Sequence, residues 1–173
     1  MQDKDRDLSG YRLSLAQETL ANAKLCMDNQ FYRDCINRSY YAAFYAIKAV
    51  LATESVDFKR HKDAVGYFNK KYVATGIFSR EAGKRLGRLK MVREESDYSD
   101  FYIASKEDAE KQYETAELII TEAKKYLKQF DNSFLQTGSY TTIGTLVVRT
   151  SYQLEAESQY FVTNEIFKAL TSI

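Results

Sequence analysis

Residues 33–51 of this chain read RDCINRSYYAAFYAIKAVL. From Tyr40 onward the segment is apolar on nearly every side, and a helix with that pattern has to be covered all round by other elements. Proline, which would interrupt such a helix, is absent from the chain, and glycine occurs only 7 times in 173 residues. We therefore expect a helix over about residues 31–54 that forms the centre of a helical bundle.

Helical periodicity predicts further helices on both sides of this one. Residues 13–27 place apolar side chains at three- and four-residue steps after a Ser9-Gly10 break, and the short connection makes the first two helices an antiparallel hairpin. Later helices are expected over about 61–73, from Ser79 to about 93, and from Ser105 to about 130, with both serines as caps. A loop is expected over 94–104. The predicted fold class is all-α, an antiparallel up-and-down bundle of about five helices.

The composition of the chain changes near residue 130. Residues 1–130 are expected to form the helical bundle, because compact domains run to roughly 100–150 residues. Residues 131–173 form a C-terminal extension that begins rich in Ser, Thr, Gly and β-branched side chains. There we expect a strand over 139–148 and a last helix over 153–170. Since a lone strand must pair with another, we expect it to contact a second copy of the chain or a partner protein.

Composition also excludes several kinds of protein and site. No run of 18 or more apolar residues exists, so no segment is expected to span a membrane. The first residues are mostly charged, unlike a signal peptide, and Cys26 and Cys35 are too few for a disulfide framework, so we expect a cytoplasmic protein. With one histidine and no glycine-rich phosphate loop, Cys-x-x-Cys pair or serine elbow, we expect no metal site and no cofactor.

Charge is distributed in two opposite blocks. Residues 59–93 hold eleven basic side chains against two acidic ones, and residues 94–122 hold ten acidic side chains against two basic ones. Two interpretations stay open. The blocks can be neighbouring helix faces that neutralise each other, or the basic block can be a surface that binds RNA or a nucleotide. For the second interpretation the candidate residues are Arg85, Arg88 and Arg93.

Three ordered motifs carry a resemblance to a known family. The central helix, the segment His61-Lys62-Asp63-Ala64-Val65, and the segment Arg93-Glu94-Glu95-Ser96-Asp97-Tyr98 together resemble the HEPN domain. More narrowly, they resemble the small stand-alone HEPN proteins of bacteria and archaea. The match covers about residues 13–127, and the extension beyond 131 has no counterpart in it.

The resemblance implies a helical bundle that forms a homodimer through its central helices. It also implies pairing with a minimal nucleotidyltransferase in a toxin–antitoxin or defence module, in which the partner can attach AMP to a tyrosine near the motif. Many HEPN proteins are metal-independent ribonucleases that use an Arg followed, after four to six residues, by a His. Tyr41, Asp97 and Tyr98 correspond to the structural signature of the family.

The ribonuclease motif is incomplete in this chain. Arg38 is present, but the positions where the histidine would fall are Ala43, Phe44 and Tyr45. A phenol with an ordinary pKa near 10 is a poor base at neutral pH, so Tyr45 is a weak replacement. His61 is the other candidate, if the packing brings it near Arg38.

Arg38 is expected to be carried inward by the apolar helix and therefore to need a partner for its charge. That partner is either a carboxylate such as Asp97 or a bound phosphate. The leading hypothesis is a dimeric HEPN protein that acts with a nucleotidyltransferase. The alternatives are an endoribonuclease that uses Arg38 with His61 or Tyr45, and an RNA- or nucleotide-binding module that uses the basic surface over 59–93.

Overall fold

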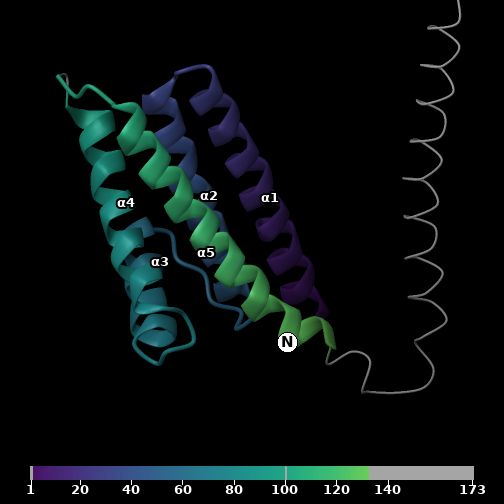
Figure 1. Ribbon diagram of the computed structural model, residues 1–173. Coiled ribbons are helices and arrows are strands. Elements are labelled where there is room, and N and C mark those ends of the chain that lie inside the picture. The colour runs from purple at the N-terminus through teal and green to yellow at the C-terminus, as the bar shows by residue number, and fades with distance from the viewer. Residues whose placement is uncertain (1, 100, 133–173) are drawn as a thin grey trace, which may run out of the picture. The chain divides into compact units, whose positions relative to one another are not determined.

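The computed structural model describes residues 2–99 and 101–132, and these form a bundle of helices (Figure 1). The elements are α1 (Asp3–Asp28), α2 (Tyr32–Ala52), α3 (His61–Phe68), the π-helical turn η1 (Asn69–Val73), α4 (Arg80–Tyr98) and α5 (Lys106–Asn132). No strand occurs in this part of the chain. The prediction of an all-α bundle of about five helices is confirmed.

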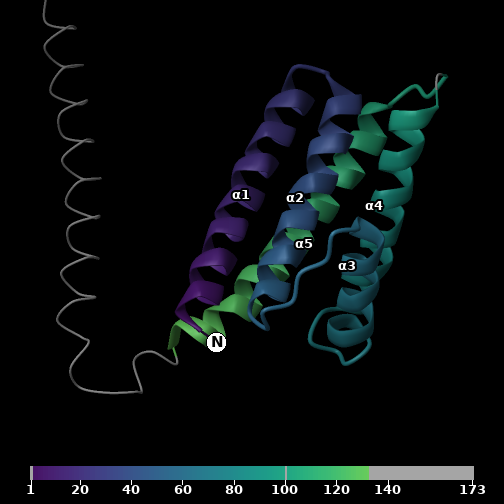
Figure 2. The same cartoon turned by 180° about the vertical axis from the view of Figure 1, so that it is seen from behind.

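The four long helices run alternately up and down, with α2 between α1 and α4 (Figures 1 and 2). α1 and α2 are an antiparallel pair joined by a tight turn in which Gln30 adopts a left-handed backbone conformation, with φ of 64°. α5 lies over one face of α2 in Figure 1, and Figure 2 shows the opposite face of α2. This opposite face is called the outer face of α2 below.

The core of the bundle is built around α2, as its apolar sequence predicts. Its side chains Ile36, Tyr40, Ile47 and Leu51 are almost completely buried. Large apolar side chains from the other elements surround them. These are Phe68, Tyr72, Phe78, Leu86, Leu89 and Ile119.

The third predicted helix is helical over its whole length but changes its winding. α3 ends at Phe68 and η1 continues to Val73, so the wider turn falls where the chain contacts α4. On α4, Gly83 faces this turn, and a Cβ built there would lie 2.8 Å from Val73 Cγ1. Only a residue without a side chain allows η1 and α4 to approach this closely.

Both predicted serine caps are confirmed. Ser79 Oγ accepts from the Ala82 N–H at 3.0 Å, and Ser105 Oγ accepts from the Asp108 N–H at 3.0 Å. These bonds satisfy N–H groups that have no partner in the first turn of a helix.

Two predicted helix boundaries are wrong. α1 begins at Asp3, so the Ser9-Gly10 break lies inside it. A Cβ added at Gly10 would contact nothing within 4 Å, and a single glycine costs a helix only about 1 kcal/mol. α4 runs on to Tyr98, through much of the predicted loop, because ion pairs one turn apart continue along it: Lys90–Glu94 at 2.7 Å and Arg93–Asp97 at 2.9 Å.

The predicted strand over 139–148 and the predicted last helix over 153–170 lie outside the described residues, and the division into 1–130 and 131–173 stays a prediction. Among residues 2–99 and 101–132, no helix combines the length and the apolar composition that crossing a membrane requires.

Candidate functional site on the outer face of α2

One stripe of α2 is covered only in part by the rest of the bundle. Arg38 is exposed on it, and Tyr41, Tyr45 and Lys48 are half-buried, whereas nearly all the other side chains from Cys35 to Ala52 are buried. These four residues follow one another at steps of three and four, so they lie along one side of the helix. We call Arg38, Tyr41, Tyr45 and Lys48 the outer stripe of α2.

The expectation that Arg38 is buried is wrong. Its side chain is exposed, and its guanidinium makes no hydrogen bond or ion pair with any other residue in the described part of the chain. The predicted pairing with Asp97 does not occur, because Asp97 pairs with Arg93. The physical reason is position: Arg38 is the exposed end of the one stripe of α2 that the neighbouring elements cover only in part.

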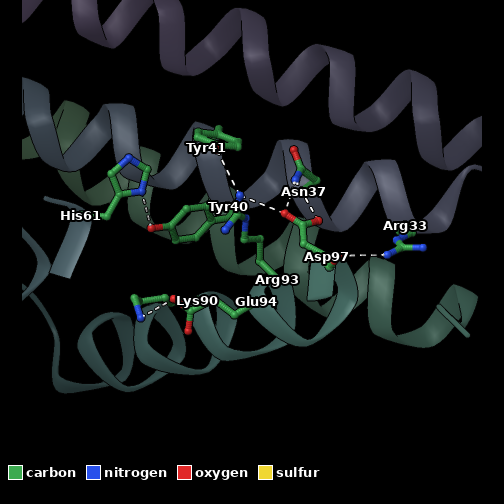
Figure 3. Close-up of polar contacts among 9 residues, drawn as sticks. All are labelled: Arg33, Asn37, Tyr40, Tyr41, His61, Lys90, Arg93, Glu94 and Asp97. Atoms are coloured by element: carbon green, nitrogen blue, oxygen red, sulfur yellow. Dashed lines mark hydrogen bonds and ion pairs between the residues drawn. The ribbon is translucent and has the colours of Figure 1, made fainter. Parts of the chain in front are cut away.

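His61 opens α3 and lies against three aromatic side chains of α2. Its Nδ1 shares a hydrogen bond of 2.9 Å with the Tyr40 hydroxyl, as Figure 3 shows. Its ring stacks on Phe44 with 3.9 Å between the ring centroids, and it meets Tyr41 edge-on at 6.0 Å. The imidazole therefore reaches Phe44, which is one of the three positions where the family motif would place a histidine.

The surroundings of His61 keep its imidazole neutral near pH 7. Its pKa is lowered first by burial and then by the positive charges of Arg93, Lys48 and Lys90. Burial raises the pKa of Tyr40 to about 12, although Arg93 acts in the opposite direction, so this phenol keeps its proton. A neutral imidazole with one ring nitrogen on a protonated phenol is a group that can take up or release a proton.

Arg93 supplies a cation to the same pair of tyrosines. Its guanidinium carbon lies 5.6 Å from the ring centroid of Tyr40 and 5.6 Å from that of Tyr41. It donates to the Tyr41 hydroxyl at 3.2 Å and pairs with Asp97 at 2.9 Å. Asn37 donates to both oxygens of Asp97 at 3.3 Å (Figure 3). Arg93 is thus fixed against α2 from two sides.

The structure brings together only part of the predicted site. His61, Tyr41, Arg93 and Asp97 form one cluster, and Tyr45 continues the stripe with its ring 6.2 Å from that of Tyr41. Within residues 2–99 and 101–132, no hydrogen bond joins any two of the predicted catalytic residues, which are Arg38, Tyr45 and His61. Tyr98 is the last residue of α4.

Sequence reasoning missed Tyr40 and Asn37 as members of the cluster. Tyr40 is only 1% exposed, and its hydroxyl reaches His61. Asn37 stands one helical turn before Tyr41, and a polar residue at the start of an apolar helix is a signal that could have indicated a partner such as Asp97.

The predicted basic trio is divided between two places. Arg85 and Arg88 line a groove between α4 and α5, whereas Arg93 faces α2. Arg85 also pairs with Glu81 at 2.6 Å. The structure therefore does not place the three arginines on one common surface.

In the part of the chain that the structure describes, no group of three His, Cys, Asp or Glu side chains is placed to hold a metal ion. Burial raises the pKa of the Cys35 thiol to about 11. That thiol is protonated at neutral pH and is not a nucleophile.

Comparison with known proteins gives the family. The family model of the HEPN domain matches residues 10–126, which span α1 to α5. The chain belongs to the HEPN domain family. Its HEPN domain contains all the residues of the cluster around His61 and Arg93.

Three relatives cover most of this HEPN protein. A UPF0332 protein of Thermotoga maritima is 29% identical over 128 residues, which are 74% of this chain and 96% of the relative. Two proteins of Methanocaldococcus jannaschii, both named putative toxin, are also similar. One is 31% identical over 117 residues (68% of this chain and 87% of the relative), and the other is 27% identical over 112 residues (65% and 76%).

Proposed function

We propose that this HEPN protein is the toxin-like component of a two-protein module, that it works as a homodimer, and that its partner is a minimal nucleotidyltransferase. The observation that carries the proposal is the family match together with two relatives that are named putative toxins. The partner and the toxin–antitoxin or defence setting follow from the resemblance to stand-alone HEPN proteins.

The outer stripe of α2 is the surface that we assign to the dimer. It presents an exposed cation and two half-buried tyrosine rings on a helix that is nearly all buried from Cys35 to Ala52, and aromatic and arginine side chains are enriched in protein interfaces. Because Arg38 makes no bond with other described residues, its guanidinium is available to a second molecule.

The dimer is tested by light scattering coupled to size-exclusion chromatography. We expect twice the 20.0 kDa mass for the wild type, a shift toward the monomer for Arg38→Glu, and no change for Arg80→Glu. Arg80 is the matched control, because it is also an exposed arginine but lies at the start of α4. A monomeric wild type, or equal dimers in both variants, would contradict this assignment.

The partner is tested by co-expression. We expect a short nucleotidyltransferase encoded beside this gene to co-purify with the tagged HEPN protein in a fixed ratio. A neighbouring gene of another class, or a nucleotidyltransferase that elutes separately, would contradict the proposed partner.

A second candidate function, metal-independent RNA cleavage, is favoured by the position of His61. Its ring and the Arg93 guanidinium flank the same two tyrosines, at 5.8–6.0 Å and 5.6 Å from their ring centroids. A neutral imidazole would take the proton from a ribose 2′-hydroxyl as that oxygen attacks the adjacent phosphorus, and the imidazolium would return the proton to O5′ as the P–O5′ bond breaks. The guanidinium, with Arg38 further along the stripe, would stabilise the charge on the phosphate.

Cleavage of structured RNA in the presence of a chelator tests this candidate. We expect His61→Gln to abolish cutting and Arg38→Ala to reduce it, with Arg80→Ala unaffected. No cutting by the wild type, or cutting that survives His61→Gln, would remove the ribonuclease from consideration without affecting the proposed partnership.

A further inference from the structure

Exposed apolar side chains gather at one end of the bundle. The α1–α2 turn and the connection from α4 to α5 both lie at the end opposite the N-terminus (Figures 1 and 2). Phe101 and Ile103 of the connection are 93% and 89% exposed, and Leu25 near the end of α1 and Phe31 before α2 are also exposed. Proteins that act alone rarely leave several large apolar side chains in water at one place, so such a group indicates an interaction site. We call Leu25, Phe31, Phe101 and Ile103 the apolar end of the bundle.

The connection is fixed to the bundle in a way that keeps Phe101 and Ile103 outward. Exposure alternates along this segment, because Tyr102 and Ala104 pack against an apolar cluster formed by α1, α2 and α5. Such alternation is typical of extended chain, in which successive side chains point to opposite sides. The backbone N–H groups of Ile103 and Ala104 donate to no acceptor among residues 2–99 and 101–132. These groups are therefore available to a second molecule.

The charge that is left unpaired around the apolar end is negative. Residues 94–97 and 106–110, which lie at the end of α4 and the start of α5, hold six carboxylates and one lysine. The exposed carboxylates of Asp34 and Glu95 make no hydrogen bond or ion pair with other described residues. Cations near this end, in contrast, already bind oxygen atoms. The pairs are Lys24 with Asp28 at 2.5 Å, Lys106 with Glu110 at 3.6 Å, and Arg33 with the Asp97 carbonyl at 3.4 Å.

A protein surface fits this end better than a membrane or a nucleic acid does. Anionic lipid headgroups and RNA phosphates are repelled by the unpaired carboxylates. The free N–H groups also need acceptors, which a hydrocarbon layer lacks and a polypeptide backbone supplies. The matching surface is therefore apolar at its centre, with lysine or arginine side chains at its rim.

We propose that the apolar end of the bundle docks the second protein of the module, and that this protein presents an apolar contact with a basic rim. The inference rests on the proposed function, which supplies that second protein. Phe101 and Ile103 are the anchors, since large side chains buried at the centre of an interface carry most of the binding energy. Asp34 and Glu95 pair with the basic rim. The apolar end shares no residue with the outer stripe of α2, so the two surfaces are tested separately.

Calorimetric titration of the full chain with the purified nucleotidyltransferase encoded beside this gene tests the docking surface. Ile103→Ser should weaken binding about ten-fold, and its combination with Phe101→Ser should weaken it about a hundred-fold, because the anchors are lost. Ile77→Ser is the matched control, since it removes an exposed isoleucine from the turn before α4 at the other end of the bundle. It should leave the Kd within about two-fold. All these variants should keep the circular dichroism spectrum of the bundle, because the side chains that they replace are exposed.

Reversal of one unpaired charge tests the basic rim of the partner. Glu95→Lys should weaken binding about three- to ten-fold at low salt, and the difference from wild type should shrink as salt is added. Glu18→Lys, which reverses an exposed carboxylate in the middle of α1, should leave the Kd within about two-fold.

Three outcomes would overturn the proposal. If Phe101→Ser/Ile103→Ser binds the nucleotidyltransferase as tightly as the wild type does, the docking surface is wrong and the proposed partnership stands. If the wild type forms no complex, the partnership and the docking surface fall together. If the wild type binds vesicles of phosphatidylglycerol and phosphatidylcholine and the double variant does not, the apolar end belongs to a membrane contact.

Discussion

Replacing Arg93 with glutamine tests the cluster on which the candidate site depends. The substitution keeps a polar side chain, which is shorter than that of arginine, but removes the cation beside Tyr40 and Tyr41. Among the side chains that the structure describes, it also leaves the Asp97 carboxylate with the Asn37 amide at 3.3 Å as its single partner. The bundle should lose stability, because two interactions with aromatic rings and one ion pair are lost together.

The expected size of the loss follows from burial. Each cation–ring contact at 5.6 Å contributes about 0.5–1 kcal/mol near a surface. The Arg93 and Asp97 side chains are 18% and 25% exposed, so their pair falls between an exposed ion pair, at about 0–1 kcal/mol, and a buried one, whose disruption costs roughly 3–5 kcal/mol. Together these give a loss of about 2–4 kcal/mol in the free energy of unfolding.

Arg60→Gln is the matched control. Its ion pair with Asp63 is shorter, at 2.7 Å, but the Arg60 side chain is 81% exposed, so its loss should cost less than about 0.5 kcal/mol. Both variants are unfolded in urea and followed by far-ultraviolet circular dichroism, and the midpoints are compared at equal m-values. If Arg93→Gln loses no more stability than Arg60→Gln, Arg93 is not held against α2 and the reasoning about the site is refuted.

Two further predictions concern packing and pH. Gly83→Ala should destabilise the bundle by about 1–2 kcal/mol, because the clash of the new Cβ with Val73 exceeds the gain in helix propensity. Gly87→Ala on the same helix meets nothing within 4 Å and should stabilise the bundle by up to about 1 kcal/mol. Thermal unfolding of the two variants checks this, and an equal shift in Tm would contradict it. Because the pKa of His61 is lowered in the fold, the unfolded chain binds more protons than the folded chain below about pH 6.5. The contribution of neutral His61 to the free energy of unfolding is therefore present above that pH. It is lost as the pH falls through the pKa of His61 in the folded chain. The gap in unfolding free energy between wild type and His61→Gln should therefore narrow from pH 7.5 to pH 5, and a gap that widens toward acid would show that the sign is wrong.

The fold was predictable because the apolar pattern of the sequence and the serine caps indicate the same helices. The apolar segment over 40–51 requires burial on nearly all sides, and Ser79 and Ser105 mark helix starts by a local mechanism that needs no tertiary contact. The two helix boundaries that were predicted wrongly lie at Gly10 and after Arg93. At both places, interactions in the neighbouring turns let the helix continue through residues of low helix propensity, and propensity alone does not predict this.

The site was only partly predictable because side-chain direction depends on the phase of each helix. Tyrosine suits both core and surface, so the sequence does not distinguish buried Tyr40 from the half-buried Tyr41 and Tyr45. Arg93 stands five residues after Arg88, which turns it about 140° around the helix and away from the α4–α5 groove. The hydrogen bond between His61 and Tyr40 joins residues 21 positions apart in the sequence, so no local sequence pattern predicts it.

The growth of cells that express this HEPN protein without the proposed nucleotidyltransferase tests the central claim most directly. The wild type and Arg80→Glu should slow growth equally, and Arg38→Glu should relieve the inhibition at the same protein level. Normal growth with the folded wild type, or inhibition that Arg38→Glu leaves intact, would contradict a toxin-like role for the outer stripe of α2.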